Sequence, residues 1–245
     1  MLSRRIIAVV GLVALLAGAC TRGGQANVPS PPASPGYHPV YDPSQFTATV
    51  DNPWFPLKPG TTWVYEGTKD GKKARDVYTV TSDTKVIAGV PCIVVHDSLY
   101  LNGALEEETL DYYSQDAQGN VWYFGEDTKT LDANGNVKST DGTFHAGVDG
   151  AQPGIFMEAQ PAIGHAFRQE YYLGQAEDQY KVASLSATIT VPYGSFQNAQ
   201  LTNEWTALEP DVLDEKYYVK GVGEVLEEAV KGPTERLQLV SFTSG

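Results

Sequence analysis

Large apolar and polar residues alternate in short runs through residues 46–245, and clusters of turn residues separate the runs. In residues 61–66 the alternation places Trp63 and Tyr65 on the opposite face from Thr62 and Val64. A period of two predicts half-buried β-strands, and β-branched and aromatic residues favour the same structure. The expected strands are 61–66, 76–81, 93–101, 105–113, 120–124, a short strand at Val137, 166–172, 181–191, 196–205, 214–219, 224–230 and 235–242.

Short connections between these runs predict how the strands pair. Asn102-Gly103 is a two-residue hairpin signal, because a type I′ turn needs positive φ at both central positions. Parallel crossovers need a dozen or more residues, so we expect an antiparallel meander. About twelve strands must curl into a half-barrel, a closed barrel or a two-layer sandwich. Residues 155–161 and 208–213 are expected to form short helical turns, and the expected core contains Trp63, Tyr65, Val80, Ile93, Val95, Trp122 and Trp205.

The N-terminus has the order of an export signal. Arg4 and Arg5 precede an apolar run at residues 6–16, which is too short to span a bilayer. Ala17-Gly18-Ala19-Cys20 follows and resembles a lipobox, the recognition sequence of the lipoprotein signal peptidase. The resemblance implies cleavage before Cys20 and acyl chains on Cys20 that anchor the protein. The alternative is an ordinary secretory signal with an incidental cysteine.

This pattern divides the chain into a signal peptide (1–19), a lipidated Cys20 with a Pro-rich tether (20–45), and one all-β domain (46–245). We expect it on the extracytoplasmic side of a bacterial membrane. Ser3-Arg4-Arg5 leaves open whether the general secretory or the twin-arginine route exports it.

Net charge and cysteine content limit the partners that the mature protein is expected to bind. The chain has a formal charge of −13, and removal of Arg4 and Arg5 with the signal peptide gives −15. Such a domain is repelled by nucleic acid and by anionic lipid surfaces, so membrane contact should come from the lipid on Cys20. Cys92 then has no partner within the mature chain, and its apolar neighbours predict a buried, unreactive thiol.

Two segments carry a family resemblance. One, at residues 52–65, reads Asn-Pro-Trp-Phe-Pro-Leu-Lys-Pro-Gly-Thr-Thr-Trp-Val-Tyr; the other combines Val-Pro-Tyr-Gly-Ser-Phe at 191–196 with Lys-Tyr-Tyr-Val-Lys-Gly-Val-Gly-Glu-Val at 216–225. Together they resemble the TapB-like bacterial envelope proteins. The resemblance implies a curved antiparallel sheet akin to the half-barrel of the LolA and LolB lipoprotein carriers. It implies no activity and no catalytic residue.

Aromatic residues suggest where a ligand could bind. The chain has 14 Tyr, 4 Trp and 8 Phe, and doubled tyrosines place one ring on each face of the sheet. A second layer of protein could cover these rings, or a ligand could. The candidate ligand-binding residues, taken with their strand neighbours, are Tyr112, Trp122, Phe124, Tyr171 and Tyr217.

Catalytic and metal chemistry is less well supported. Carboxylates cluster at 106–108, 126–127, Asp149 and 177–178, as a hydrolase would need, but an acidic surface produces such clusters freely. Residues 132–136 resemble part of a calcium loop, yet the expected Gly and Glu positions do not match, so a hairpin turn is preferred. No catalytic residue, metal site or cofactor is predicted.

The sequence therefore favours a non-enzymatic, lipid-anchored envelope protein that binds a hydrophobic or amphipathic ligand on a curved sheet. An accessory protein that binds only other envelope proteins is the alternative, and an acidic-cluster hydrolase is the third.

Overall fold

The computed structural model describes residues 36–245, which form an almost entirely β structure. The predictions for the signal peptide, for Cys20 and for most of the tether lie outside these residues. The described part contains one short 3-10 helix, η1 (Pro43–Gln45), and no α-helix. Its strands are β1 (Phe46–Thr47), β2 (Thr62–Lys69), β3 (Lys72–Ile87), β4 (Val90–Leu101), β5 (Ala104–Asp116), β6 (Val121–Leu131), β7 (Val137–Ser139), β8 (Phe144–His145), β9 (Gln152–Met157), β10 (Ala166–Arg168), β11 (Glu170–Tyr171), β12 (Asp178–Val191), β13 (Gly194–Thr206), β14 (Leu213–Val219), β15 (Gly223–Lys231) and β16 (Glu235–Thr243).

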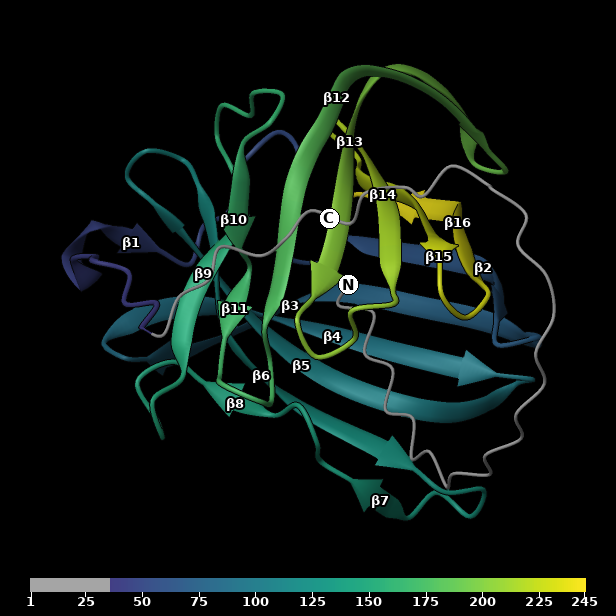
Figure 1. The fold of residues 1–245 in the computed structure, drawn as a ribbon, viewed down its shortest axis with the longest axis horizontal. Coiled ribbons are helices and arrows are strands. Elements are labelled where there is room, and N and C mark those ends of the chain that lie inside the picture. Colours follow the sequence, from purple (N-terminus) through teal and green to yellow (C-terminus); the bar gives the residue numbers. More distant parts are fainter. Residues whose placement is uncertain (1–35) are drawn as a thin grey trace, which may run out of the picture.

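These strands form one antiparallel sheet that is nearly closed into a barrel (Figure 1). Two meanders, β2–β6 and β12–β16, are joined where β16 pairs with β2, and β9 and β10 continue the two free edges. In Figure 1, β3–β6 run across the view and β12–β14 cross them at a steep angle. The predicted all-β class and antiparallel meander are confirmed.

The turns follow the expected chemistry. Asn102 and Gly103 both have positive φ, 52° and 87°, and connect β4 to β5. Residues 132–136 also form a tight turn, in which the Asp132 carboxylate accepts the backbone N–H groups of Asn134 and Asn136. Such turn sequences predict hairpins well, because few residues other than Gly, Asn and Asp tolerate the positive φ that these turns require.

The main hydrophobic core lies on the inner face of the curled sheet. Antiparallel partners share a face, and both meanders contribute, for example with Val80 from β3 and Tyr218 from β14. Residues 50–57 form a floor at one end, where Phe55 packs against Tyr113 and Phe156 with ring centroids 5.3 and 4.6 Å apart. All seven expected core residues are buried.

Both segments that resemble the TapB-like proteins meet at this floor. The Trp63 indole N–H donates to the Val222 carbonyl oxygen at 2.6 Å. The Gly221 backbone N–H donates to the Pro53 carbonyl oxygen at 2.7 Å. Gly221 has a φ of 78°, which a glycine adopts without strain. The motifs therefore have a structural role in joining the first core strand to the β14–β15 hairpin.

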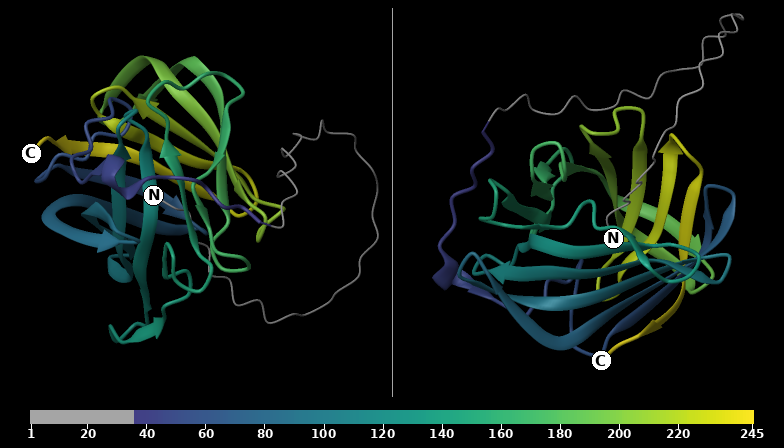
Figure 2. Two further views of the ribbon diagram at one scale, coloured as in Figure 1. Left: turned by 90° about the vertical axis from the view of Figure 1, so that its left-hand side faces the viewer. Right: turned by 90° about the horizontal axis from the view of Figure 1, so that it is seen from below.

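A second hydrophobic cluster lies on the outer face. Tyr112, Trp122 and Phe124 pack there with the buried Cys92. Residues 36–47, at the end of the predicted tether, run along the barrel (Figure 2), and the Tyr41 and Phe46 rings contact this cluster. Burial raises the pKa of the Cys92 thiol to about 12, as an unreactive cysteine requires.

The two expected helical turns do not form. Residues 155–157 belong to β9, which pairs with β6. Residues 208–213 form a hydrogen-bonded turn that leads into β14. The apolar run at 155–157 is buried by pairing with a distant strand, which a local pattern does not reveal. Among the described residues, none of the helices has the length and apolar character of a membrane span.

Candidate functional site

The inner face carries a band of buried carboxyl groups above the aromatic floor. Strand register places them there: Tyr78 lies opposite Asp97, Val95 lies opposite Asp111, and Asp111 lies opposite Glu126. The second meander contributes further carboxyl groups opposite these. The inward carboxyl groups are Asp76, Asp97, Glu107, Asp111, Glu126, Glu204, Asp214, Glu224, Glu227 and Glu235, and the inward ammonium groups are Lys69 and Lys216. We call this set the inner acidic band.

Asp76 and Asp97 form a carboxyl pair within the band. The register places Asp76 opposite Leu99 and Asp97 opposite Tyr78, so the two carboxyl groups are diagonal neighbours on the inner face. Burial raises the pKa of Asp76 to about 6, and burial together with the Asp76 charge raises the pKa of Asp97 well above its usual range. Both shifts oppose ionisation of the two groups at the same time.

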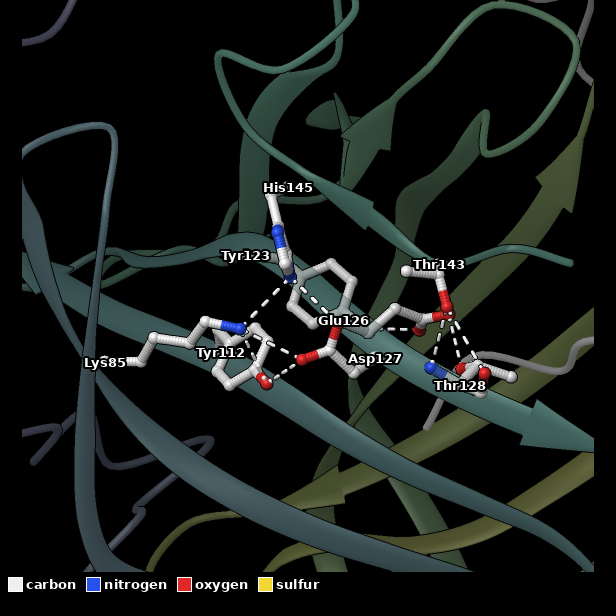
Figure 3. A network of polar contacts seen from close by, with 8 residues as sticks. All are labelled: Lys85, Tyr112, Tyr123, Glu126, Asp127, Thr128, Thr143 and His145. Atoms are coloured by element: carbon white, nitrogen blue, oxygen red, sulfur yellow. Dashed lines mark hydrogen bonds and ion pairs between the residues drawn. The ribbon is translucent and has the colours of Figure 1, made fainter. Parts of the chain in front are cut away.

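A second shared contact involves Tyr123. Its hydroxyl group lies 2.6 Å from both Asp111 Oδ1 and Glu126 Oε2; Figure 3 draws Tyr123 with Glu126. A phenol has one proton to donate, so the second contact is a hydrogen bond when a carboxyl group carries a proton. Burial and the neighbouring Glu126 charge raise the pKa of Asp111 well above its usual range, which agrees with that arrangement. The Thr128 hydroxyl also donates to Glu126, at 2.7 Å.

Lys216 stands among three glutamates on the opposite wall. Its Nζ lies 3.5 Å from Glu204 Oε2, 3.7 Å from Glu227 Oε1 and 3.9 Å from Glu224 Oε2. Burial alone would lower the pKa of Lys216, but the surrounding glutamates outweigh burial and raise it. Burial raises the pKa of Glu224 and of Glu227. The charge of Lys216 lowers both values but is outweighed, because one ammonium group is shared by three carboxylates. Near the barrel end, Lys69 Nζ pairs with Glu235 Oε1 at 3.0 Å.

Several carboxylate oxygens of the band have no hydrogen-bond partner. They include both oxygens of Glu224, Oε1 of Glu227, Oδ1 of Asp76 and Oδ1 of Asp97. Glu224 also lines a cavity of about 10 Å³ in the aromatic floor, together with Phe55, Trp63, Tyr65 and Tyr78. A buried carboxylate next to aromatic rings is costly unless a partner neutralises it. This junction of floor and band is the candidate site.

An outer polar cluster lies on the other side of β6, also in Figure 3. Asp127 Oδ2 accepts from Lys85 Nζ at 2.9 Å and from the Tyr112 hydroxyl, while Asp127 Oδ1 lies 3.0 Å from His145 Nε2. Burial would raise the pKa of Asp127, but hydrogen bonds from Tyr112 and Lys85 and the nearby positive charge lower it. The cluster balances its charges and joins β3, β5, β6 and β8. We interpret it as structural.

The structure does not bring the five predicted ligand-binding residues together. Tyr112, Trp122 and Phe124 lie in the outer cluster under Tyr41 and Phe46. Tyr171 contacts the Arg168 guanidinium and the Tyr37 ring, and the Tyr217 hydroxyl donates to Glu215. Their strand neighbours Tyr113, Tyr123 and Tyr218 face the interior instead. Whether the five bind a ligand stays a prediction.

The acidic clusters of the sequence are divided between the two faces. Glu126 points inward and Asp127 outward, because neighbours on a strand alternate. Asp149 is exposed, and within residues 106–108 only the middle position shares the inner face with Leu99. Sequence reasoning missed the inner acidic band, whose signal is a charged residue at an apolar position of an alternating strand, such as Asp76.

Comparison with known proteins gives little beyond this. No family model matches the chain, and no curated protein is similar to it. It is similar to a solved structure from Bacteroides fragilis described as an exported protein with a YmcC-like fold, at 14% identity and a TM-score of 0.45, covering 78% of this chain and 99% of that chain. It is also similar to one from Parabacteroides distasonis described as a lipoprotein, at 11% identity and a TM-score of 0.41, covering 78% and 98%. Both similarities are too low to transfer a function.

Proposed function

We propose that this chain is a lipid-anchored protein of the bacterial cell envelope that binds an amphipathic ligand on the inner face of its curved sheet. It acts by binding and not by catalysis. The observation that carries the proposal is the amphipathic interior, in which a floor of aromatic rings adjoins the inner acidic band.

The energetics of the band support a binding role. A buried carboxylate that lacks a hydrogen bond costs at least about 1–3 kcal/mol. Replacing buried charged groups with apolar residues is often neutral or stabilising. Glu224 and the Asp76–Asp97 pair therefore weaken the empty fold, and a ligand that donates hydrogen bonds to them would recover that free energy. Ionisable groups with shifted pKa values are typical of functional sites.

The location in the envelope rests on the N-terminal sequence. The charged residues, the apolar run and Ala-Gly-Ala-Cys at 17–20 are the features that lipoprotein export and acylation require. The resemblance to TapB-like envelope proteins belongs to the same proposal. Its first motif contributes Phe55, Trp63 and Tyr65 to the aromatic floor, and Gly221 and Val222 of the second motif hydrogen-bond to the first.

Binding can be tested on residues 20–245 produced without the signal peptide and with Cys20→Ala, so that no acyl chain can be attached. Native mass spectrometry would look for a co-purifying small molecule. Calorimetric titration would then compare dodecylamine, dodecanoic acid and dodecyl maltoside below their micellar concentrations. We expect at least one of them to bind with one-to-one stoichiometry. If none binds and nothing co-purifies, the proposal is wrong and the accessory-protein alternative takes its place.

A further inference from the structure

We infer that the polar end of this ligand is an organic cation with a primary ammonium group, held between Glu224 and the Asp76–Asp97 pair at the edge of the aromatic floor. The inference rests on the proposed function and adds the chemical class of the ligand.

The first argument is the charge balance of the interior. The inner acidic band contains ten carboxyl groups and two ammonium groups. Lys69 is paired with Glu235, and Lys216 is shared by three glutamates. Neither Asp76 nor Asp97 is ion-paired with a lysine or arginine among residues 36–245. An added cation is the partner that this excess of negative charge would attract.

The second argument is the geometry around Tyr65. Its hydroxyl group donates to the backbone carbonyl oxygen of Glu224 at 3.0 Å. The charges of Glu224, Asp76 and Asp97 also act on this hydroxyl group, and with burial they raise the pKa of Tyr65 well above its usual range. The strand register places Asp76 directly opposite Tyr65, and Asp97 lies one strand further along, opposite Tyr78. Residues from three different strands therefore bring carboxyl groups to the neighbourhood of one tyrosine.

The third argument is the set of unused acceptors. Glu224 is 3% exposed, and neither of its carboxylate oxygens has a hydrogen-bond partner. The Lys216 ammonium group lies 3.9 Å from it, beyond hydrogen-bond length. Oδ1 of Asp76 and Oδ1 of Asp97 are also buried without a partner. A primary ammonium group has three N–H donors and no acceptor, so it complements such a set.

The aromatic floor favours an organic cation over a metal ion. The cavity beside Glu224 is lined by the rings of Phe55, Trp63, Tyr65 and Tyr78. Aromatic faces attract ammonium groups through cation–π interactions, whereas Mg²⁺ and Ca²⁺ require a shell of oxygen ligands. The part of the chain that the structure describes has no group of three or more His, Cys, Asp or Glu side chains arranged to hold a metal ion.

Calorimetric titration of the same Cys20→Ala chain tests the inference. We expect dodecylamine to bind roughly tenfold or more tightly than dodecanoic acid or dodecyl maltoside, because a charge-assisted hydrogen bond is worth that factor. Glu224→Gln should weaken dodecylamine binding by a similar factor. The matched control is Glu66→Gln on the outer face of β2, where the side chain is 53% exposed, and it should leave binding unchanged.

The possible outcomes separate this inference from the proposed function. If dodecanoic acid or dodecyl maltoside binds as tightly as dodecylamine, the cationic class is wrong and the amphipathic-ligand proposal stands. If no amphiphile binds, both are wrong. If micromolar CaCl₂ or MgCl₂ displaces dodecylamine, the site is a metal site and the inference is overturned. Should Glu224→Gln fail to fold, Asp97→Asn provides the same comparison, with the melting temperature as the check.

Discussion

Asp76 shows how one residue couples the interior to pH. It points inward from β3 between Ala74 and Tyr78, and burial raises its pKa from 3.8 to about 6. Between those two values the folded protein holds a proton that the unfolded chain releases. The contribution of Asp76 to stability is therefore fully present below about pH 4 and is lost as the pH rises through about 6.

Replacing Asp76 with asparagine should flatten this dependence. We expect the free energy of unfolding of the wild type to decrease between pH 4 and pH 6 relative to Asp76→Asn. The variant no longer titrates at this position and keeps a hydrogen-bonding side chain beside Asp97. Urea denaturation across the pH range measures the difference. Asp83→Asn, at an exposed position of the same strand, is the control, and a pH-independent difference between Asp76→Asn and the wild type would contradict the prediction.

Single residues also show what the sequence could predict. Alternation correctly placed Trp63 and Tyr65 in the core. It also predicted that doubled tyrosines face opposite sides, as Tyr112 and Tyr113 do. Alternation does not reveal which side is concave, so it favoured Tyr112 as a ligand residue. That choice depends on the curvature of the whole sheet, which no single residue encodes.

The two meanders are joined by one element pair, β2 with β16. Gly67 lies in the middle of β2, opposite Leu237. A Cβ atom added at Gly67 would overlap the backbone carbonyl oxygen of Arg236. The absence of a side chain therefore allows the last strand to approach the first.

Gly67→Ala should consequently weaken the pairing between the two meanders. We expect a loss of about 1–3 kcal/mol in the free energy of unfolding, because the backbone must shift to relieve the overlap. Gly194→Ala is the matched control, since Gly194 also has an ordinary φ and a Cβ there would make only van der Waals contacts. Hydrogen exchange should show faster exchange in β2 and β16 of the Gly67 variant. Equal stability of the two variants would contradict this account.

The segment at residues 36–47 is an element whose role the sequence did not suggest. Tyr41 makes edge-to-face contacts with Phe46 and Phe124 at 5.8 and 5.6 Å. Pro-rich composition predicted a tether through residue 45, and composition does not detect one well-placed ring. The contact decides how the end of the tether leaves the barrel.

Tyr41→Ala should detach this segment. We expect a cost of about 1–3 kcal/mol from the lost ring contacts and faster proteolysis between residues 36 and 46. The control is Val40→Ala, because Val40 is 98% exposed and should be neutral. Limited proteolysis with mass spectrometry measures both variants, and identical cleavage rates would show that the Tyr41 contacts do not hold the segment.

At the scale of the molecule, the strands could be predicted, but the joining of the two meanders could not. Local alternation and the Asn102-Gly103 turn gave the antiparallel meander. The β2–β16 pairing joins residues such as Lys69 and Glu235 that lie far apart in the chain, and no local pattern reports it. The inner acidic band depends on that junction, since it gathers carboxyl groups from both meanders. The net charge of −13 was therefore interpreted as surface charge, although part of it lies inside.

At the same scale, the predicted lipid on Cys20 and the net charge of the domain together determine how the protein would attach to a membrane. Cys20 ends the charged, apolar and small-residue order that predicts a signal sequence, and two or more acyl chains on it would hold the protein stably at a membrane. A formal charge of −15 after cleavage opposes direct contact between the domain and anionic lipid.

We therefore expect Cys20→Ala to move the protein from the membrane fraction to the soluble fraction and to abolish incorporation of labelled palmitate. Cys92→Ala is the matched control, because that thiol is buried and its pKa is about 12, and it should stay membrane-bound. If the Cys20→Ala protein still fractionates with membranes and takes up label, the protein is anchored in another way and the lipoprotein assignment is wrong.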